Sequence, residues 1–186
     1  ASSVARYAEA TFAAVDGVLA RVPPDRRPRV YLARGPDGLE TGLAGSINTE
    51  IIERVGAINV AAAGGGRDGL AKVQLEQILA WNPAAIVTWD QTFYGMVATD
   101  PGWAGVAAVA AGKVFLSPGL PFGWIDRPPS LNRLIGLRWA SARLYPDLAA
   151  LDLRQETKEF YGLFYHVALD DAALDRLLGP SGGEAR

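Results

Sequence analysis

Three loops of the chain carry arginine, aromatic and acidic side chains that could bind a ligand. Each loop directly follows a predicted strand, and open α/β sheets bind ligands at the carboxyl ends of their strands. Arginine pairs with an anionic group, and tryptophan packs on an apolar frame. The candidate ligand-binding residues are Arg34, Glu40 and Thr41 in the first loop, Trp89 and Asp90 in the second, and Phe122, Trp124 and Arg127 in the third. A structural role is an open alternative for two of them: Trp124 as a loop anchor, and Arg127 bonded to local carbonyl groups.

A glycine-rich segment, 64–69, fits the pattern G-x-G-x-x-G. It follows a predicted strand, is expected to open a helix, and has Asp90 about 20 residues further on, as in a dinucleotide-binding site. This pattern would make the chain an NAD-binding oxidoreductase domain. Against that interpretation, the Arg67-Asp68 pair is unusual inside such a motif. The motif would also begin only on the second strand, after a complete strand–helix unit. The alternative is a flexible glycine loop.

The remaining polar residues form no catalytic or metal-binding pattern. His166 is the only histidine, which we interpret as structural, and the chain has no cysteine. Glu40, Asp90 and Asp126 are too scattered to argue an acid–base pair, and neither G-x-S-x-G nor H-E-x-x-H occurs. The net charge of −2 gives no basic surface for nucleic acid. We therefore expect a protein that is not an enzyme and has no cofactor, no metal site and no nucleic-acid partner.

The stretch 73–90 predicts how one of these loops is positioned. Apolar residues at helical spacing indicate an amphipathic helix, with Glu76 on its polar face. Asn82-Pro83 ends that helix, because proline cannot continue it and restricts the residue before it. The apolar run 84–89 is then a strand buried on both faces, and it delivers Asp90 to the carboxyl edge of the sheet.

The same alternation of strands and helices runs along the rest of the chain. We expect helices over 2–22, 47–55 (with Ser46 as N-cap), 91–99, 131–144 (with Ser130 as N-cap), 153–165 and 172–178, and strands over 29–33, 58–61 and 113–116. At 186 residues and 49% hydrophobic composition the chain can bury a substantial core. No apolar run is long enough to span a membrane. The predicted fold class is α/β: a three-layer α/β/α lobe with a mainly parallel, Rossmann-like sheet of about four to five strands.

Several segments together resemble a known family. The sequence Glu-x-x-Leu-x-x-Asn-Pro at 76–83, followed by an apolar strand, resembles the C-terminal lobe of ABC-transporter substrate-binding proteins. The group is the class III type, in which a rigid helix joins the two lobes: siderophore, haem and vitamin B12 binders. Other matching pieces are Trp103 with 106–115, then Pro118, Trp124, Arg127-Pro128 and 144–146, and finally Phe160-Tyr161 with Phe164-Tyr165. Phe115 stands where the family usually has tyrosine.

The resemblance implies a domain organisation. Residues 1–22 would be the end of the connector helix between the lobes, 23–178 the C-terminal substrate-binding lobe, and 179–186 a disordered tail. The N-terminal lobe would be missing, so half of the ligand contacts would be missing with it, and the isolated chain would bind weakly.

The resemblance also implies a function. The protein would bind an iron chelate of the ferric siderophore type between two lobes, in the periplasm or another extracytoplasmic compartment, either free or lipid-anchored. Glu76 would dock into an arginine pocket of the ABC permease membrane subunits, a directed contact suited to transient association. Alternative cargoes are a corrinoid, haem, or an oxyanion such as molybdate or tungstate. A purely structural α/β interaction domain is a further alternative.

Overall fold

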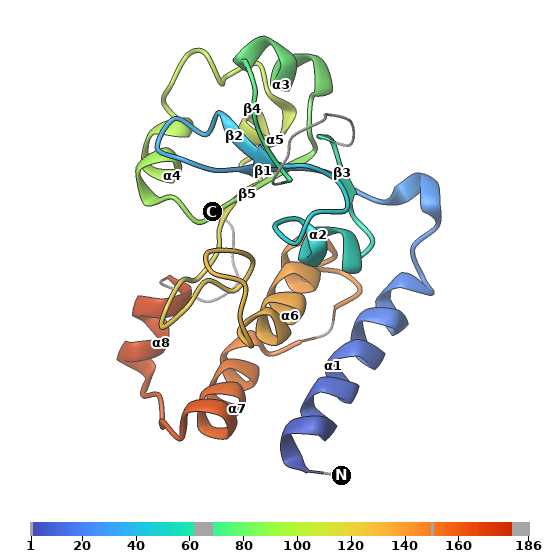
Figure 1. Ribbon diagram of the computed structural model, residues 1–186, viewed down its shortest axis with the longest axis vertical. Helices are drawn as coiled ribbons and strands as arrows, with labels where there is room; N and C mark the ends of the chain where they lie inside the picture. The colour runs from blue at the N-terminus through green and yellow to red at the C-terminus, as the bar shows by residue number, and fades with distance from the viewer. Residues whose placement is uncertain (1, 62–68, 150, 180–186) are drawn as a thin grey trace.

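The structure, a computed structural model, describes residues 2–61, 69–149 and 151–179. A four-stranded parallel sheet lies between two groups of helices (Figure 1). Its strands, in spatial order, are β3 (Ile58–Asn59), β1 (Arg29–Ala33), β5 (Ala85–Thr88) and β6 (Val114–Leu116). The predicted α/β fold with a mainly parallel sheet is therefore confirmed.

Side chains of the central strand β1 alternate between two cores. Val30 and Leu32 pack in one core with residues of α1 (Ser3–Leu19), α2 (Glu50–Arg54), α6 (Arg133–Leu144) and α7 (Leu153–Tyr165). Tyr31 and Ala33 pack in the other core with residues of α3 (Leu75–Trp81), α4 (Gln91–Val97) and α5 (Ala107–Ala110). All four strand residues are fully buried. This double burial is why the strands read as continuous apolar runs in the sequence.

The predicted helix–turn–strand unit is present as α3 and β5. Asn82 ends α3 in the left-handed conformation, with φ of 45°, and its side chain accepts a hydrogen bond from the backbone N–H of Ala107. Ile78 is fully buried, whereas Leu79, expected on the same buried face, is 37% exposed. Glu76 is exposed, as its place on the polar face predicted.

Two helix starts differ from the prediction. Ser46 does not cap a helix: α2 begins at Glu50 after Thr49. The Thr49 hydroxyl donates to the Leu43 carbonyl instead of accepting from the helix. Helix α6 begins at Arg133 rather than Leu131, and its N-cap residue is Asn132 rather than Ser130. The Ser130 hydroxyl oxygen accepts from the Asn132 N–H.

A small second sheet was not predicted. Residues expected to form only a loop contain β2 (Glu40–Gly42), which pairs antiparallel with β4 (Leu70–Lys72). The remaining elements are a 3-10 turn, η1 (Pro24–Arg26), and a last helix, α8 (Asp171–Leu178), beside α7. Across the described part of the chain, no helix combines the length and apolar character needed to cross a bilayer.

Candidate functional site

The carboxyl edge of the sheet brings the ends of β1, β5 and β6 together. Arg34 follows β1, Trp89 follows β5, and the loop after β6 contributes Asp126 and Arg127. The paired strands are parallel and in register, with Ala33 beside Thr88 and Thr88 beside Leu116. Their next residues therefore emerge at one place, as expected for a parallel sheet.

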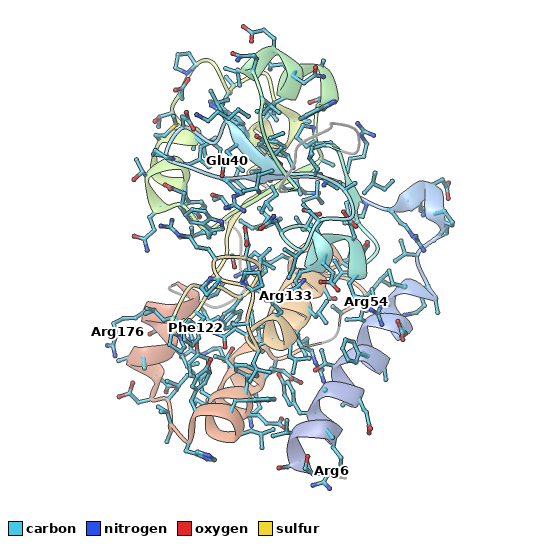
Figure 2. The ribbon with its side chains drawn as sticks, in the orientation of Figure 1. Arg6, Glu40, Arg54, Phe122, Arg133 and Arg176 are labelled. Atoms are coloured by element: carbon cyan, nitrogen blue, oxygen red, sulfur yellow. The ribbon has the colours of Figure 1, made fainter. Side chains whose placement is uncertain are left out.

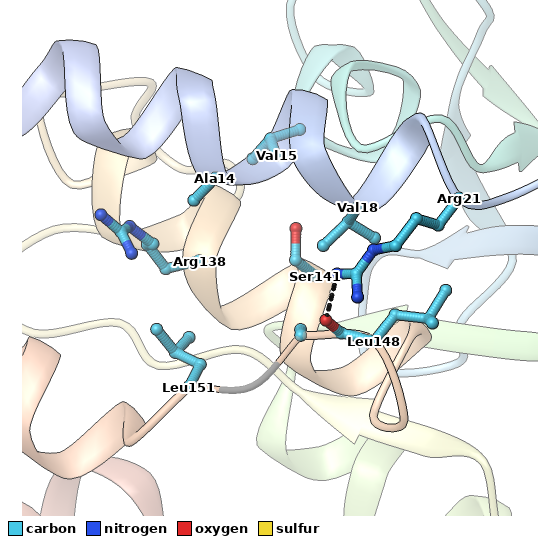
Figure 3. A pocket seen from close by; sticks show the side chains of 9 residues that line it. Ala14, Val15, Val18, Arg21, Arg138, Ser141, Leu148 and Leu151 are labelled. Carbon is cyan, nitrogen blue, oxygen red and sulfur yellow. Dashed lines mark hydrogen bonds between the residues drawn. The ribbon is translucent and has the colours of Figure 1, made fainter.

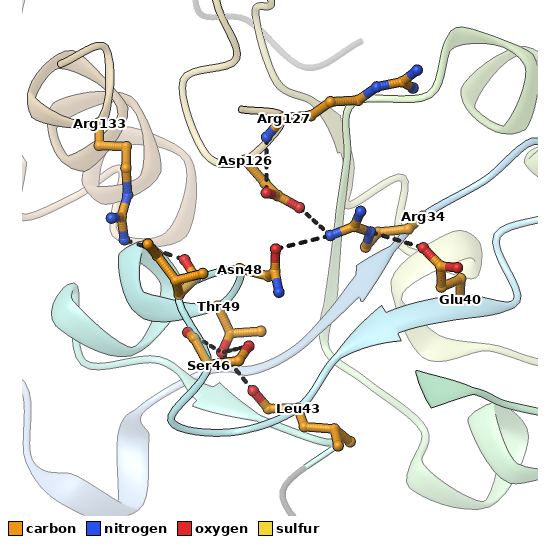
Figure 4. A network of polar contacts seen from close by, with 10 residues as sticks. Arg34, Glu40, Leu43, Ser46, Asn48, Thr49, Asp126, Arg127 and Arg133 are labelled. Carbon is orange, nitrogen blue, oxygen red and sulfur yellow. Dashed lines mark hydrogen bonds and ion pairs between the residues drawn. The ribbon is translucent and has the colours of Figure 1, made fainter. Parts of the chain in front are cut away.

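Arg34 is the centre of a polar network at this edge (Figure 4). Its Nε donates to Glu40 Oε1 at 3.1 Å, and its Nη1 donates both to Asn48 Oδ1 at 3.1 Å and to Asp126 Oδ2. The Arg34 side chain is only 13% exposed, and that of Asp126 is 3% exposed. Two carboxylates therefore already neutralise the Arg34 guanidinium within this chain.

Trp89 is in contact with two arginines. The guanidinium carbon of Arg127 is 4.4 Å from the indole ring centroid, and that of Arg34 is 5.7 Å away, so both make cation–π contacts. The Trp89 indole N–H is buried and has no hydrogen-bond acceptor among the described residues.

Arg127 is the exposed cation of this edge. Its backbone has φ of 65°, in the left-handed region, and its N–H donates to Asp126 Oδ1 at 2.8 Å. The side chain stacks on Trp89 rather than bonding local carbonyl groups. In the described part of the chain, no carboxylate pairs with its guanidinium. It is therefore the group best placed to meet an incoming anion.

Tyr31 holds the hairpin that carries Arg34 and Glu40 in place. The Tyr31 hydroxyl donates to the Gly38 carbonyl at 2.8 Å. Burial, together with the nearby carboxylates of Asp37 and Glu40, raises the pKa of Tyr31 well above its usual value, so the hydroxyl stays protonated. Gly38 has φ of 71°, and a Cβ there would overlap the Phe93 ring. Local packing thus sets the position of the site's first loop.

The other predicted ligand residues do not all join this cluster. Trp124 and Thr41 are fully buried, so neither side chain offers surface to a ligand, and Trp124 is a loop anchor in the core. Asp90 caps α4 by accepting from the N–H groups of Thr92 and Phe93. Phe122 is 45% exposed but lies well away from Glu40 (Figure 2). Arg34, Glu40, Trp89 and Arg127 are the predicted residues that the fold brings together.

Sequence reasoning missed two members of the network, Asn48 and Asp126. In the sequence, Asp126 is one of three acids too scattered to suggest a site. Its contact with Arg34 spans 92 residues, and no local pattern reports such a distance. No group of three or more histidine, cysteine or acidic side chains among the described residues could hold a metal ion.

The dinucleotide interpretation does not match the local structure. Most of the segment 64–69 lies outside the described residues, but Gly69 is followed by strand β4 rather than by a helix. The next helix, α3, begins only at Leu75. A pyrophosphate site requires the glycine loop to open a helix, whose N-terminus binds the phosphates. The prediction that this loop opens a helix is wrong.

The remaining two predicted roles concern Glu76 and His166. Glu76 lies exposed in the first turn of α3, where the helix dipole favours a carboxylate, and it makes no ion pair with the described residues. His166 is the left-handed residue that ends α7, with φ of 55°. Its backbone N–H donates to the Tyr161 carbonyl, in line with a structural role.

Comparison with known proteins identifies relatives of this chain. The sequence profile described as periplasmic binding protein matches residues 5–119. The molybdate-binding protein MolA of Haemophilus influenzae is 36% identical over 160 residues, which are 83% of this chain and 44% of MolA.

Solved structures give the same picture. An ABC transporter solute binding protein from Sulfurospirillum deleyianum superposes with a TM-score of 0.90 and 32% identity, covering 96% of this chain and 55% of that one. MolA bound to molybdate superposes with a TM-score of 0.75 and 32% identity, covering 90% of this chain and 51% of MolA. The chain thus spans about half the length of the relatives it matches.

Proposed function

The chain belongs to the periplasmic binding protein family, and from that premise we propose that it forms the C-terminal lobe of the substrate-binding protein of an ABC importer. In this proposal the protein works in the periplasm and holds its cargo without covalent chemistry. The carboxyl edge of the sheet faces the cargo, and helix α1 is the end of the connector to the other lobe. Support comes from the family match and from coverage of about half of each relative.

The proposed cargo is a small oxyanion of the molybdate or tungstate type. One observation carries this choice: Arg127 is exposed on the face of Trp89 and has no carboxylate partner among the described residues. A guanidinium held over an aromatic ring is oriented to donate hydrogen bonds to an oxyanion. The name of MolA, a molybdate-binding protein at 36% identity, supports the same class.

The test is a tryptophan-fluorescence titration of the full-length protein with molybdate, tungstate, sulfate, a ferric siderophore, haem and cobalamin. We expect a saturable change with molybdate or tungstate, because Trp89 lies at the proposed site. Replacing Arg127 with alanine should weaken that binding roughly 10- to 100-fold, the value of a charge-assisted hydrogen bond. Arg26→Ala, on the exposed turn η1, is the matched control and should leave affinity unchanged. Equal binding by the Arg127→Ala protein would refute the assignment.

An iron chelate is the second candidate cargo. Leu120 and Phe122 are 67% and 45% exposed in the loop after β6, and such apolar side chains suit the organic frame of a siderophore. Saturable quenching by the ferric siderophore, lost in Phe122→Ser and retained in Arg127→Ala, would favour this cargo over an oxyanion.

We further propose that Glu76 docks on the permease. Its carboxylate is exposed and makes no ion pair with described residues, so it is free to meet an arginine of a membrane subunit. Glu76→Ala should reduce uptake by cells while leaving the affinity for cargo intact. Glu9→Ala, an exposed glutamate on α1, is the control. Loss of cargo binding in Glu76→Ala would contradict a docking role.

A further inference from the structure

A cavity lies between α1, α6 and the residues Leu148, Ala149 and Leu151 (Figure 3). Its volume is about 210 Å³, roughly seven times the share of a water molecule in the liquid. None of the residues at the carboxyl edge lines it. The cavity is therefore separate from the carboxyl edge and from the proposed cargo site.

The hydroxyl of Ser141 is the first polar group in this cavity. Ser141 is 5% exposed, and its Oγ is buried with no hydrogen-bond partner among the described residues. In Figure 3 the hydroxyl points from α6 toward α1, between Ala14 and Val18. A buried hydroxyl without a partner costs free energy, so a polar atom that enters the cavity would be stabilised there.

Two arginines give the cavity its charge. Arg21 donates through Nε to the Gly17 carbonyl at 3.1 Å and through Nη2 to the Leu148 carbonyl at 2.6 Å. Both acceptors are neutral, so the charge of Arg21 is not compensated by them. Arg138, in contrast, is paired with Glu156 Oε1 at 3.2 Å. No acidic residue lines the cavity in the described part of the chain.

The rest of the wall is apolar. Val15 and Val18 contribute from α1, and Leu148 and Leu151 also contribute. Both valines are almost completely buried. A ligand that fits here must therefore combine one anionic group with a short hydrocarbon part, in the manner of small-molecule sites with an apolar wall and a few polar groups.

We propose that this cavity binds a small amphipathic monocarboxylate. Its carboxylate would accept hydrogen bonds from the Ser141 hydroxyl and the Arg21 guanidinium, and its hydrocarbon part would lie against Val15 and Val18. The ligand would bridge α1 and the body of the lobe.

The experiment uses the full-length protein with butyrate, hexanoate and benzoate as probes and 1-butanol as the uncharged comparison. Methyl signals of Val15 and Val18 in NMR titrations report on the cavity, and the fluorescence of Trp89 reports on the carboxyl edge. We expect saturable shifts of both valines with the carboxylates and not with the alcohol, without a change at Trp89.

Two variants test the polar contacts. Ser141→Val fills part of the space and removes the hydroxyl, and Arg21→Met removes an exposed charge with little risk to folding. Each should weaken carboxylate binding by at least about tenfold. Arg26→Met is the matched control and should bind as the parent does. Unshifted valine methyl signals, equal shifts with 1-butanol, or undiminished binding by Arg21→Met would overturn the proposal.

Discussion

Replacing Asp126 with asparagine should destabilise the fold and at the same time release Arg34. Asp126 is 2% exposed, and its carboxylate accepts from Arg34 Nη1 and from the Arg127 N–H. Removing one partner of a buried ion pair costs about 3–5 kcal/mol. The cost here should be smaller, about 2 kcal/mol, because asparagine keeps one acceptor oxygen and Arg34 keeps Glu40 and Asn48.

For a chain of this length, each kcal/mol corresponds to about 2–4 °C in Tm, so Asp126→Asn should lower Tm by about 4–8 °C. Thermal and urea unfolding measure this directly. Glu50→Gln is the control: its ion pair with Arg133 has a 63% exposed carboxylate, and its loss should cost less than about 1 kcal/mol.

Asp126→Asn should strengthen anion binding although it weakens the fold. With Asp126 neutral, Arg34 is compensated by Glu40 alone, and the edge gains one net positive charge. We therefore expect the folded Asp126→Asn protein to bind an oxyanion more tightly than the parent. A loss of stability no greater than that of Glu50→Gln would refute the network's structural role. Unchanged or weaker anion binding would refute the reasoning about charge.

Three further predictions follow from the packing and from the length of the chain. Gly136→Ala should lower the free energy of unfolding by about 1–3 kcal/mol, measured in urea, because a Cβ at this position would overlap the Trp124 carbonyl. The control Gly162→Ala, with no atom within 4 Å of the new Cβ, should raise it by up to about 1 kcal/mol. An unchanged stability of Gly136→Ala would contradict the close packing. Burial raises the pKa of Tyr161 to about 12. The stabilisation by the protonated Tyr161 hydroxyl is therefore complete below about pH 10 and is lost as pH rises through 12. Tyr161→Phe should flatten the fall of Tm over that range, and an unchanged fall would contradict this prediction. If the chain is the lobe proposed above, the isolated 186 residues should bind the cargo of the two-lobed protein at least about tenfold more weakly in the same fluorescence titration. Equal affinities would show that one lobe suffices.

The sequence predicted the elements whose signals are local. The unit α3–β5 is an example: an apolar helical stripe, an Asn-Pro stop and a short β-rich run each act within a few residues. The left-handed cap at Asn82 was not predicted, although asparagine tolerates positive φ better than most residues. These features need no knowledge of the rest of the chain.

What the sequence could not predict depends on contacts between distant residues. Asp126 joins Arg34 only because β1 and the loop after β6 end at the same edge. Strand β2 forms because the fold brings β4 beside it, and the two strands pair. Trp124 carries the same local pattern whether its ring faces a ligand or the core. The structure shows it fully buried in the core, with Gly136 of α6 packed closely against its backbone.

The charge balance of the carboxyl edge limits what this chain can do alone. Arg34 and Arg127 carry two positive charges, and Glu40 and Asp126 carry two negative ones, so these four groups sum to zero. A dianion that approaches Arg127 would meet one uncompensated guanidinium, and its second charge would lose water without gaining a partner. Further hydrogen-bond donors must therefore come from outside this edge. Under the proposed function we expect those donors from the other lobe, with Arg127 and the face of Trp89 as the contribution of this chain. The chain spans about half the length of the relatives it matches.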